Sequence, residues 1–141
     1  MALLLSLLAT PAVHVLFVMF GAPFLDLVPH TALLSAHASL LALFPVFYTR
    51  GVEPRPWRAV AAFAAPLDEV FGGLVGAAAG AWLGAVPIPL DWDRIWQRWP
   101  VTVLVGMVGG YVVGKGLGGT LAFGKRLGVM SDGEVKESKT E

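Results

Sequence analysis

The stretch Phe71-Gly-Gly-Leu-Val-Gly-Ala-Ala-Ala-Gly-Ala-Trp-Leu-Gly84 places a glycine at every fourth position, and Gly106-Met-Val-Gly-Gly-Tyr-Val-Val-Gly-Lys-Gly-Leu-Gly118 repeats this spacing. Four residues make about one helical turn, so each set forms a nearly continuous stripe of small residues along a helix. The predicted packing residues are Gly72, Gly76, Gly80, Gly84, Gly106, Gly110, Gly114 and Gly118, and the first stripe is widened by Ala77, Ala78, Ala79 and Ala81. Two arrangements stay open: the two helices pair as an antiparallel hairpin, or one stripe receives a helix of a partner protein.

Charged residues are scarce outside the glycine stripes as well. They make up 14% of the 141 residues, against about 25% in soluble domains. Four runs hold almost no charge, and they are residues 1–25, 27–49, 70–90 and 99–114, the last reaching 124 if Lys115 is tolerated. Because a spanning helix needs about 20 apolar residues, we predict an all-α fold, a polytopic membrane helical bundle of about four transmembrane helices.

The predicted bundle is a single domain over residues 1–128, followed by a disordered cytoplasmic tail over 129–141. The spans are expected at about 2–22, 31–48, 67–86 and 101–122. The connection 50–66 and residues 125–141 hold seven Lys and Arg residues, whereas the loop 87–100 holds two. By the positive-inside rule, both termini are then cytoplasmic and the loop lies on the lumenal or exterior side.

The loop Asp91-Trp-Asp-Arg-Ile-Trp-Gln-Arg-Trp-Pro100 is the most informative polar stretch. We predict a short interfacial helix starting near Asp91, with the three tryptophans on one face and Asp91, Arg94 and Arg98 on another. The loop is either an aromatic anchor with an internal Asp91–Arg94 pair, or a site where arginines hold a lipid phosphate or a partner's acidic residue. The candidate contact residues are Asp91, Trp92, Asp93, Arg94, Trp96, Gln97, Arg98 and Trp99.

Asp68 and Glu69 open the third predicted span just after Pro66. Acidic residues at this position complement the dipole at a helix N-terminus. Alternatively, they contact Arg55, Arg58 or a partner protein.

His30 and His37 lie seven residues apart on one face of the second predicted span. No carboxylate or third histidine stands at ligand spacing, so we expect no metal site and no cofactor. We expect His30 at the membrane interface and a helix–helix hydrogen bond from His37, with Ser35 or Ser39 as the nearby partners.

Several classes of function are disfavoured by the composition. Ten basic and ten acidic residues leave no positive excess for nucleic acid, and the absence of cysteine excludes disulfides and a thiolate nucleophile. The sequence also holds no phosphate-binding loop, no HExxH motif and no plausible Ser-His-Asp set. We therefore predict no catalytic residues in this chain.

Several segments together resemble one known family. They are Pro29-His-Thr31, Ala36-His37, Pro66-Leu-Asp-Glu-Val-Phe-Gly-Gly73, the run from Gly80 to Arg94, Trp96-Gln97, Trp99-Pro100-Val101, Gly110-Tyr111 and Gly114. The pattern resembles the PIG-F family of glycosylphosphatidylinositol (GPI) anchor biosynthesis in its fungal form, over roughly residues 12–127. Family members usually have about two further spans before the region of Met1, so the chain looks like an N-terminally shortened form. Ile95 stands where the family often has proline.

The resemblance implies a multi-pass protein of the endoplasmic reticulum membrane without catalytic residues. It implies binding to the large ethanolamine-phosphate transferases PIG-O or PIG-G, which add phosphoethanolamine to mannoses of the GPI precursor on the lumenal face. It also suggests contact with membrane lipids such as phosphatidylethanolamine or the GPI precursor.

Two other functions remain as alternatives. A small oligomeric, glycine-packed transporter or channel requires an ionisable residue in a pore, for which His37 and Lys115 are the candidates. A lipid-handling enzyme would use Asp91 and Asp93 as its carboxylate pair.

Overall fold

The structure is a computed structural model, and it describes residues 1–90, 92–121 and 123. Its elements are helices throughout this part of the chain. In order they are α1 (Ala2–Met19), α2 (Val28–Ala38), the π-helical turn η1 (Ser39–Leu43), α3 (Phe44–Arg50), α4 (Pro54–Ala61), α5 (Glu69–Ala85), the 3-10 turn η2 (Ile95–Gln97) and α6 (Val101–Gly119). The tail 129–141, predicted to be disordered, lies outside the described residues.

Three of these helices are long and apolar enough to cross a membrane: Ala2–Met19, the continuous helix Val28–Arg50 and Val101–Gly119. The prediction of a helical membrane bundle is therefore confirmed. Helix α5 has 17 residues, which gives a length of about 25 Å against a hydrocarbon core of about 30 Å. Four crossings, and the single domain over 1–128, thus remain predictions.

The second long helix passes through a π-helical turn, which the sequence analysis did not predict. Pro45 stands just after η1, and proline lacks the N–H that an α-helix needs while its ring clashes with the carbonyl four residues earlier. A π-helical turn makes room for such a residue without ending the helix. The helix therefore continues to Arg50.

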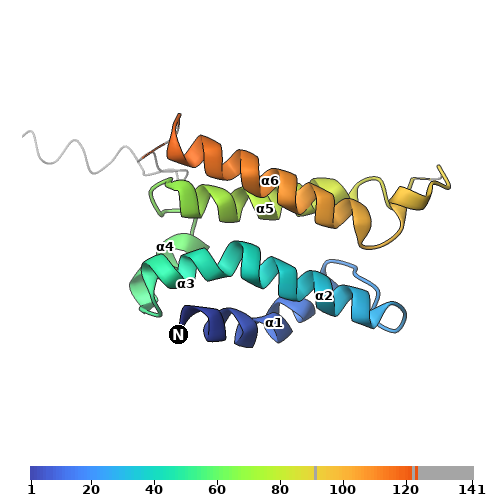
Figure 1. Ribbon diagram of the computed structural model, residues 1–141, viewed down its shortest axis with the longest axis horizontal. Helices are drawn as coiled ribbons and strands as arrows, with labels where there is room; N and C mark the ends of the chain where they lie inside the picture. Colours follow the sequence, from blue (N-terminus) through green and yellow to red (C-terminus); the bar gives the residue numbers. More distant parts are fainter. Residues whose placement is uncertain (91, 122, 124–141) are drawn as a thin grey trace, which may run out of the picture.

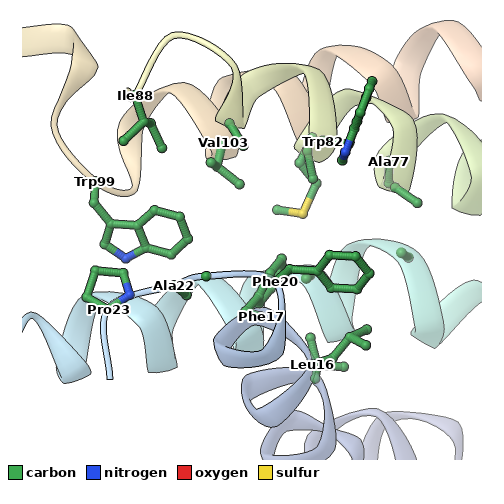
Figure 2. Close-up of a pocket in the computed structure, with 18 of the residues that line it drawn as sticks. Leu16, Phe17, Phe20, Ala22, Pro23, Ala77, Trp82, Ile88, Trp99 and Val103 are labelled. Carbon is green, nitrogen blue, oxygen red and sulfur yellow. The ribbon is translucent and has the colours of Figure 1, made fainter. Parts of the chain in front are cut away.

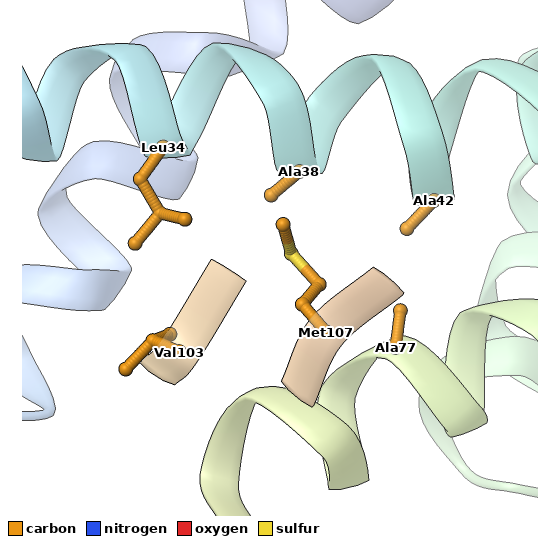
Figure 3. Packing of buried hydrophobic residues seen from close by; sticks show 6 residues of the cluster. All are labelled: Leu34, Ala38, Ala42, Ala77, Val103 and Met107. Carbon is orange, nitrogen blue, oxygen red and sulfur yellow. The ribbon is translucent and has the colours of Figure 1, made fainter. Parts of the chain in front are cut away.

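The helices form two layers (Figure 1). One layer holds the hairpin of α5 and α6, and the other holds α1 against the helix that runs from α2 to α3. A small hydrophobic core joins the layers, with the side chain of Met107 directed toward Ala38 and Ala42 of the opposite layer (Figure 3). Its buried members are Leu34, Ala38, Ala42, Ala77, Val103 and Met107.

The two ends of the bundle carry different connections. The 50–66 connection lies at the end that also holds Met1 and the C-terminal end of α6, whereas the 20–27 turn and the 86–100 loop lie at the other end (Figure 1). Within the 50–66 connection, α4 packs Val60 into a second buried cluster with Ala65 and Phe71. The arginine-rich connection and the loop therefore lie at opposite ends of the helices, the arrangement assumed in the sequence-based orientation.

Candidate functional site

Helices α5 and α6 meet backbone to backbone through the two glycine stripes. A Cβ added to Gly76 would clash with the carbonyl oxygen of Gly110 and would lie 2.8 Å from the Cα of Gly114. A Cβ on Gly80 would likewise lie 2.9 Å from the Cα of Gly110. The same crowding against facing backbone recurs at Gly72, Gly84, Gly106, Gly114 and Gly118. All eight stripe glycines thus lie in one antiparallel seam within the chain, and this face is occupied rather than open to a partner helix.

Not every glycine of the hairpin lies in this seam. Around Gly109 and Gly116, nothing comes within 4 Å of an added Cβ, so both face away from α5. Gly73 faces the ring of Tyr111, and Gly119 faces the side chain of Glu69. Gly109 and Gly116 can therefore serve as control positions for substitutions of the seam glycines.

The loop that joins α5 to α6 is held by Gln97. This side chain is 7% exposed, and its Nε2 donates hydrogen bonds to the carbonyl oxygens of Pro87, at 2.8 Å, and Leu90, at 2.9 Å. Its Oε1 accepts a hydrogen bond from the backbone N–H of Arg94 at 2.9 Å. Because both ends of the amide are used, the loop is fastened to itself at three points. The sequence analysis included Gln97 among the contact candidates but missed this role.

The predicted interfacial helix is reduced to the single 3-10 turn η2. Asp93 has a φ of 49°, in the left-handed region, and Arg94 is extended, so an α-helix starting near Asp91 does not form. The segment is held by the hydrogen bonds between the Gln97 side chain and backbone groups, and not by the backbone hydrogen bonds of an α-helix. Asp91 itself, and with it the proposed Asp91–Arg94 pair, lies outside the described residues.

The three loop tryptophans do not share a face, contrary to the prediction. The rings of Trp92 and Trp96 pack together at 5.9 Å between centroids and stay exposed. Trp99 instead turns toward the other layer, where its Nε1 donates a hydrogen bond to Oγ1 of the fully buried Thr31 at 3.0 Å. The prediction assumed the spacing of an α-helix. Because this segment is not an α-helix, the three side chains do not lie on one face.

The charged side chains of the loop point away from the bundle. Asp93, Arg94 and Arg98 are all exposed, while the neighbouring Gln97 and Trp99 are anchored. Chemically, two guanidinium groups and a carboxylate on a fastened loop can contact a lipid headgroup or the polar surface of another protein.

Asp68 begins α5, as expected of an acidic residue at a helix start. Its Oδ1 accepts a hydrogen bond from the backbone N–H of Phe71 at 2.7 Å. Its Oδ2 pairs with Nη2 of Arg50 at 2.8 Å, and this is the one ion pair among the described residues. The alternative contact to Arg55 or Arg58 was therefore wrong, because the end of α3 brings Arg50 closer. Glu69 is exposed and touches the edge of α6 at Gly119.

Of the two histidines of α2, His37 is placed differently from expectation, and the position of His30 at the membrane interface stays a prediction. Both His30 and His37 are exposed on the outer face of the helix, and His37 forms no hydrogen bond to Ser35 or Ser39 within the described chain. Ser35 donates instead to the carbonyl oxygen of Thr31 at 2.7 Å. The prediction for His37 failed because the serines occupy the buried face of the helix. No cluster of three potential metal ligands occurs among the described residues.

A large cavity between the two layers is the feature that the sequence analysis missed. It has a volume of about 690 Å³, and α1, α5 and the start of α6 contribute its walls (Figure 2). On α5 the lining includes Ala77, Ala78 and Ala81, which the sequence analysis had counted as part of the glycine stripe. Because these side chains are small, they do not fill the space between the layers. Their role as cavity walls can be recognised only once the position of α1 is known.

Comparisons with known proteins connect this arrangement to one family. A sequence profile of the GPI biosynthesis protein family Pig-F matches residues 1–119. The chain is 64% identical over 121 residues to glycosylphosphatidylinositol anchor biosynthesis protein 11 of Pyricularia oryzae, covering 86% of this chain and 46% of that protein. The protein of the same name in Neurospora crassa is 60% identical over 127 residues, or 90% of this chain and 47% of that protein.

A human protein shows a more distant similarity. The GPI ethanolamine phosphate transferase, stabilizing subunit, of Homo sapiens is 36% identical over 105 residues, covering 72% of this chain and 48% of that protein. The chain thus spans about half the length of the curated relatives it matches. No solved structure matches it significantly. The profile match over most of the chain, together with the fungal identities, shows that the chain belongs to the Pig-F family of GPI biosynthesis proteins.

Proposed function

We propose that this chain is a non-catalytic membrane subunit that binds and stabilises a GPI ethanolamine phosphate transferase. The observation that carries the proposal is its similarity to the human protein named as the stabilizing subunit of that transferase. The proposed partner is a large transferase of the PIG-O or PIG-G type, in the membrane of the endoplasmic reticulum. In this role the chain supports the addition of phosphoethanolamine to a mannose of the GPI precursor.

The geometry of the 86–100 loop supports a contact role on the lumenal side. Gln97 and Trp99 fasten the loop, so Asp93, Arg94 and Arg98 are held outward at little further cost in conformational entropy when a partner binds. The arginine-rich 50–66 connection lies at the opposite end and favours the cytoplasm. We therefore propose a lumenal loop, cytoplasmic termini and four crossings, with the loop contacting the transferase or a phospholipid headgroup.

The test is an affinity purification of the tagged chain from microsomes in mild detergent, with identification of the co-purifying proteins. The double variant Arg94→Ala/Arg98→Ala removes the guanidinium groups of the loop. Arg55→Ala/Arg58→Ala is the matched control, because it removes two exposed arginines from the other end of the bundle.

We expect recovery of a large transferase with the unaltered chain and with the Arg55/Arg58 control, and reduced recovery with the loop variant. Equally reduced recovery of the transferase with both double variants would mean that binding depends on the total positive charge of the chain and not on the loop. Recovery of the chain alone, as a defined oligomer, would contradict the proposal and favour the transporter alternative.

A further inference from the structure

The cavity between the layers is lined by residues of both layers. Phe17 of α1 and Ala42 of η1 line one side, while Ala81 of α5 and Met107 of α6 line the other. Trp99, whose indole is fixed by Thr31, closes the end next to the loop (Figure 2). The cavity is therefore part of the packing between the layers and does not belong to the polar loop proposed above as the contact site.

The lining of the cavity is chemically uniform. The described residues that line it include no charged side chain, and their polar side-chain atoms are the indole nitrogens of Trp82 and Trp99. The N–H of Trp99 is already donated to Thr31. A buried water needs two to four polar partners, so water does not fill this space well. The complement of such a lining is neutral hydrocarbon.

The cavity is open to the surroundings between α1 and α5. Three lining residues at this side are strongly exposed: Leu16 at 49%, Phe20 at 78% and Trp82 at 67%. Helix α1 is apolar enough to span a membrane, and α5 runs beside the spanning helix α6. In a bilayer, the opening therefore faces the acyl chains of lipids.

The size of the cavity distinguishes between hydrocarbon occupants. A cavity of about 150 Å³ holds a benzene molecule, and this one is more than four times larger, at about 690 Å³. A transmembrane helix is about 10 Å wide, so three turns of it would need roughly 1,200 Å³. The space thus suits a flexible chain and is too small for a partner's helix.

We propose that the cavity is a binding site for one acyl chain of a membrane phospholipid. The chain enters between α1 and α5 and packs against Phe17 and Trp82, while its headgroup stays outside. It fills the gap that the small alanines of α5 leave between the layers. This inference holds whether or not the chain binds a transferase.

A phosphatidylcholine with a diazirine in its acyl chain tests the proposal. The full chain is reconstituted in phosphatidylcholine nanodiscs containing this probe, illuminated, and digested to locate the labelled residues. Phe17 and Trp99 line the cavity and are partly buried, whereas Val105 is 67% exposed on the outside of α6. We expect label on Phe17 and Trp99 as well as on Val105.

A pair of variants links the label to the cavity. Ala81→Phe places a ring in the cavity, whereas Ala79→Phe places the same ring on an exposed part of α5 that does not line it. We expect Ala81→Phe to reduce labelling of Phe17 and Trp99 strongly and Ala79→Phe to leave it unchanged. If Ala81→Phe does not fold, Ala42→Leu fills the cavity from the opposite wall.

Three results would overturn the proposal. Label confined to outward residues such as Val105 would show that no acyl chain enters. Equal labelling of Phe17 and Trp99 in the Ala81→Phe and Ala79→Phe variants would show that the lipid reaches them by another route. Label that reaches these two residues only after a co-purifying protein is stripped away would show that a protein side chain occupies the cavity.

Discussion

The seam inside the α5–α6 hairpin and the interface between the two layers are built on opposite principles. In the seam, glycines bring two backbones into contact along the whole length of the helices. Between the layers, a few small side chains touch and a cavity of about 690 Å³ remains beside them. Lipid gives helices no hydrophobic reason to associate, so close backbone packing is the stronger of the two. We therefore expect the hairpin to be the more rigid unit and the layer interface to be the more adaptable one.

Polar contacts between the layers are found near the two ends of the bundle. At the loop end, Trp99 of the hairpin donates to Thr31 of α2. At the other end, Arg50 of α3 pairs with Asp68 at the start of α5. The layers are thus linked at both ends around a loosely filled middle, which is what an acyl-chain site requires.

Breaking the seam should have the largest effect. Gly110→Leu forces a side chain onto the carbonyl oxygen of Gly76, and that backbone has no room to move aside. Overpacking typically costs about 1–3 kcal/mol, and we expect at least the upper end here. The measurement is unfolding in mixed micelles with increasing dodecyl sulfate, followed by circular dichroism.

Gly109→Leu is the matched control for this variant. Gly109 is the adjacent residue on the same helix, and an added Cβ there meets nothing within 4 Å. We expect its unfolding midpoint to stay near that of the unaltered chain. Equal destabilisation by both variants would mean that leucine disturbs α6 wherever it is placed and that the seam is not special.

The second-largest effect is expected in the loop. Gln97→Leu removes three hydrogen bonds and leaves the carbonyl oxygens of Pro87 and Leu90 without this donor. The two carbonyl oxygens keep the backbone N–H groups of Leu90 and Trp92 as donors, so the cost is that of the lost hydrogen bonds, about 0.5–1.5 kcal/mol each. We expect rapid proteolysis between residues 86 and 100, measured by mass spectrometry. Ile95→Ala, at a side chain that is 79% exposed, should leave the cleavage rate unchanged.

A smaller effect should follow from loosening the link at the loop end. Trp99→Phe keeps an aromatic ring but loses the hydrogen bond to Thr31, which is worth about 0.5–1.5 kcal/mol. Trp92→Phe changes an exposed tryptophan of the same loop and serves as the control. Should the two variants unfold at the same point, Trp99 would contribute nothing as a link between the layers.

At the opposite link the smallest effect of all is expected for Arg50→Ala, whereas Asp68→Ala should cost more. Asp68→Ala loses both the helix cap and the ion pair, and a cap alone is worth about 0.5–2 kcal/mol. Arg50→Ala loses the ion pair but keeps the cap, and with Asp68 39% exposed we expect about 0.2–1 kcal/mol. Unfolding of both variants and of the double variant measures the coupling. A larger loss in Arg50→Ala than in Asp68→Ala would contradict this order.

The seam could be predicted from the sequence because its rule is local. Glycine at every fourth residue predicts close helix packing but left open whether the second helix belongs to the chain or to a partner, and the structure places the two stripes of the chain against each other. The role of Asp68 was predictable for the same reason, since a cap depends on residues three positions away. The pairing of Asp68 with Arg50 could not be predicted, because it depends on where α3 ends in space.

The loop and the cavity could not be predicted because their causes are not local. The bonds of Gln97 reach back to Pro87 and Leu90, and Trp99 bonds a residue 68 positions earlier. Helical spacing therefore misplaced the indoles. The alanines of α5 read as packing residues, and only the separation of α1 from α5 turns them into cavity walls. The prediction of a hydrogen bond from His37 to Ser35 or Ser39 failed for the same reason, because the sequence did not show which face of the helix is buried.

The most direct test of the account is the amount of the transferase in membranes of cells whose own Pig-F protein has been removed. The account predicts that expression of the chain raises the transferase level, that Gly109→Leu does the same, and that Gly110→Leu does not, because the seam of the hairpin is broken. A transferase level that is the same with and without the chain would contradict it.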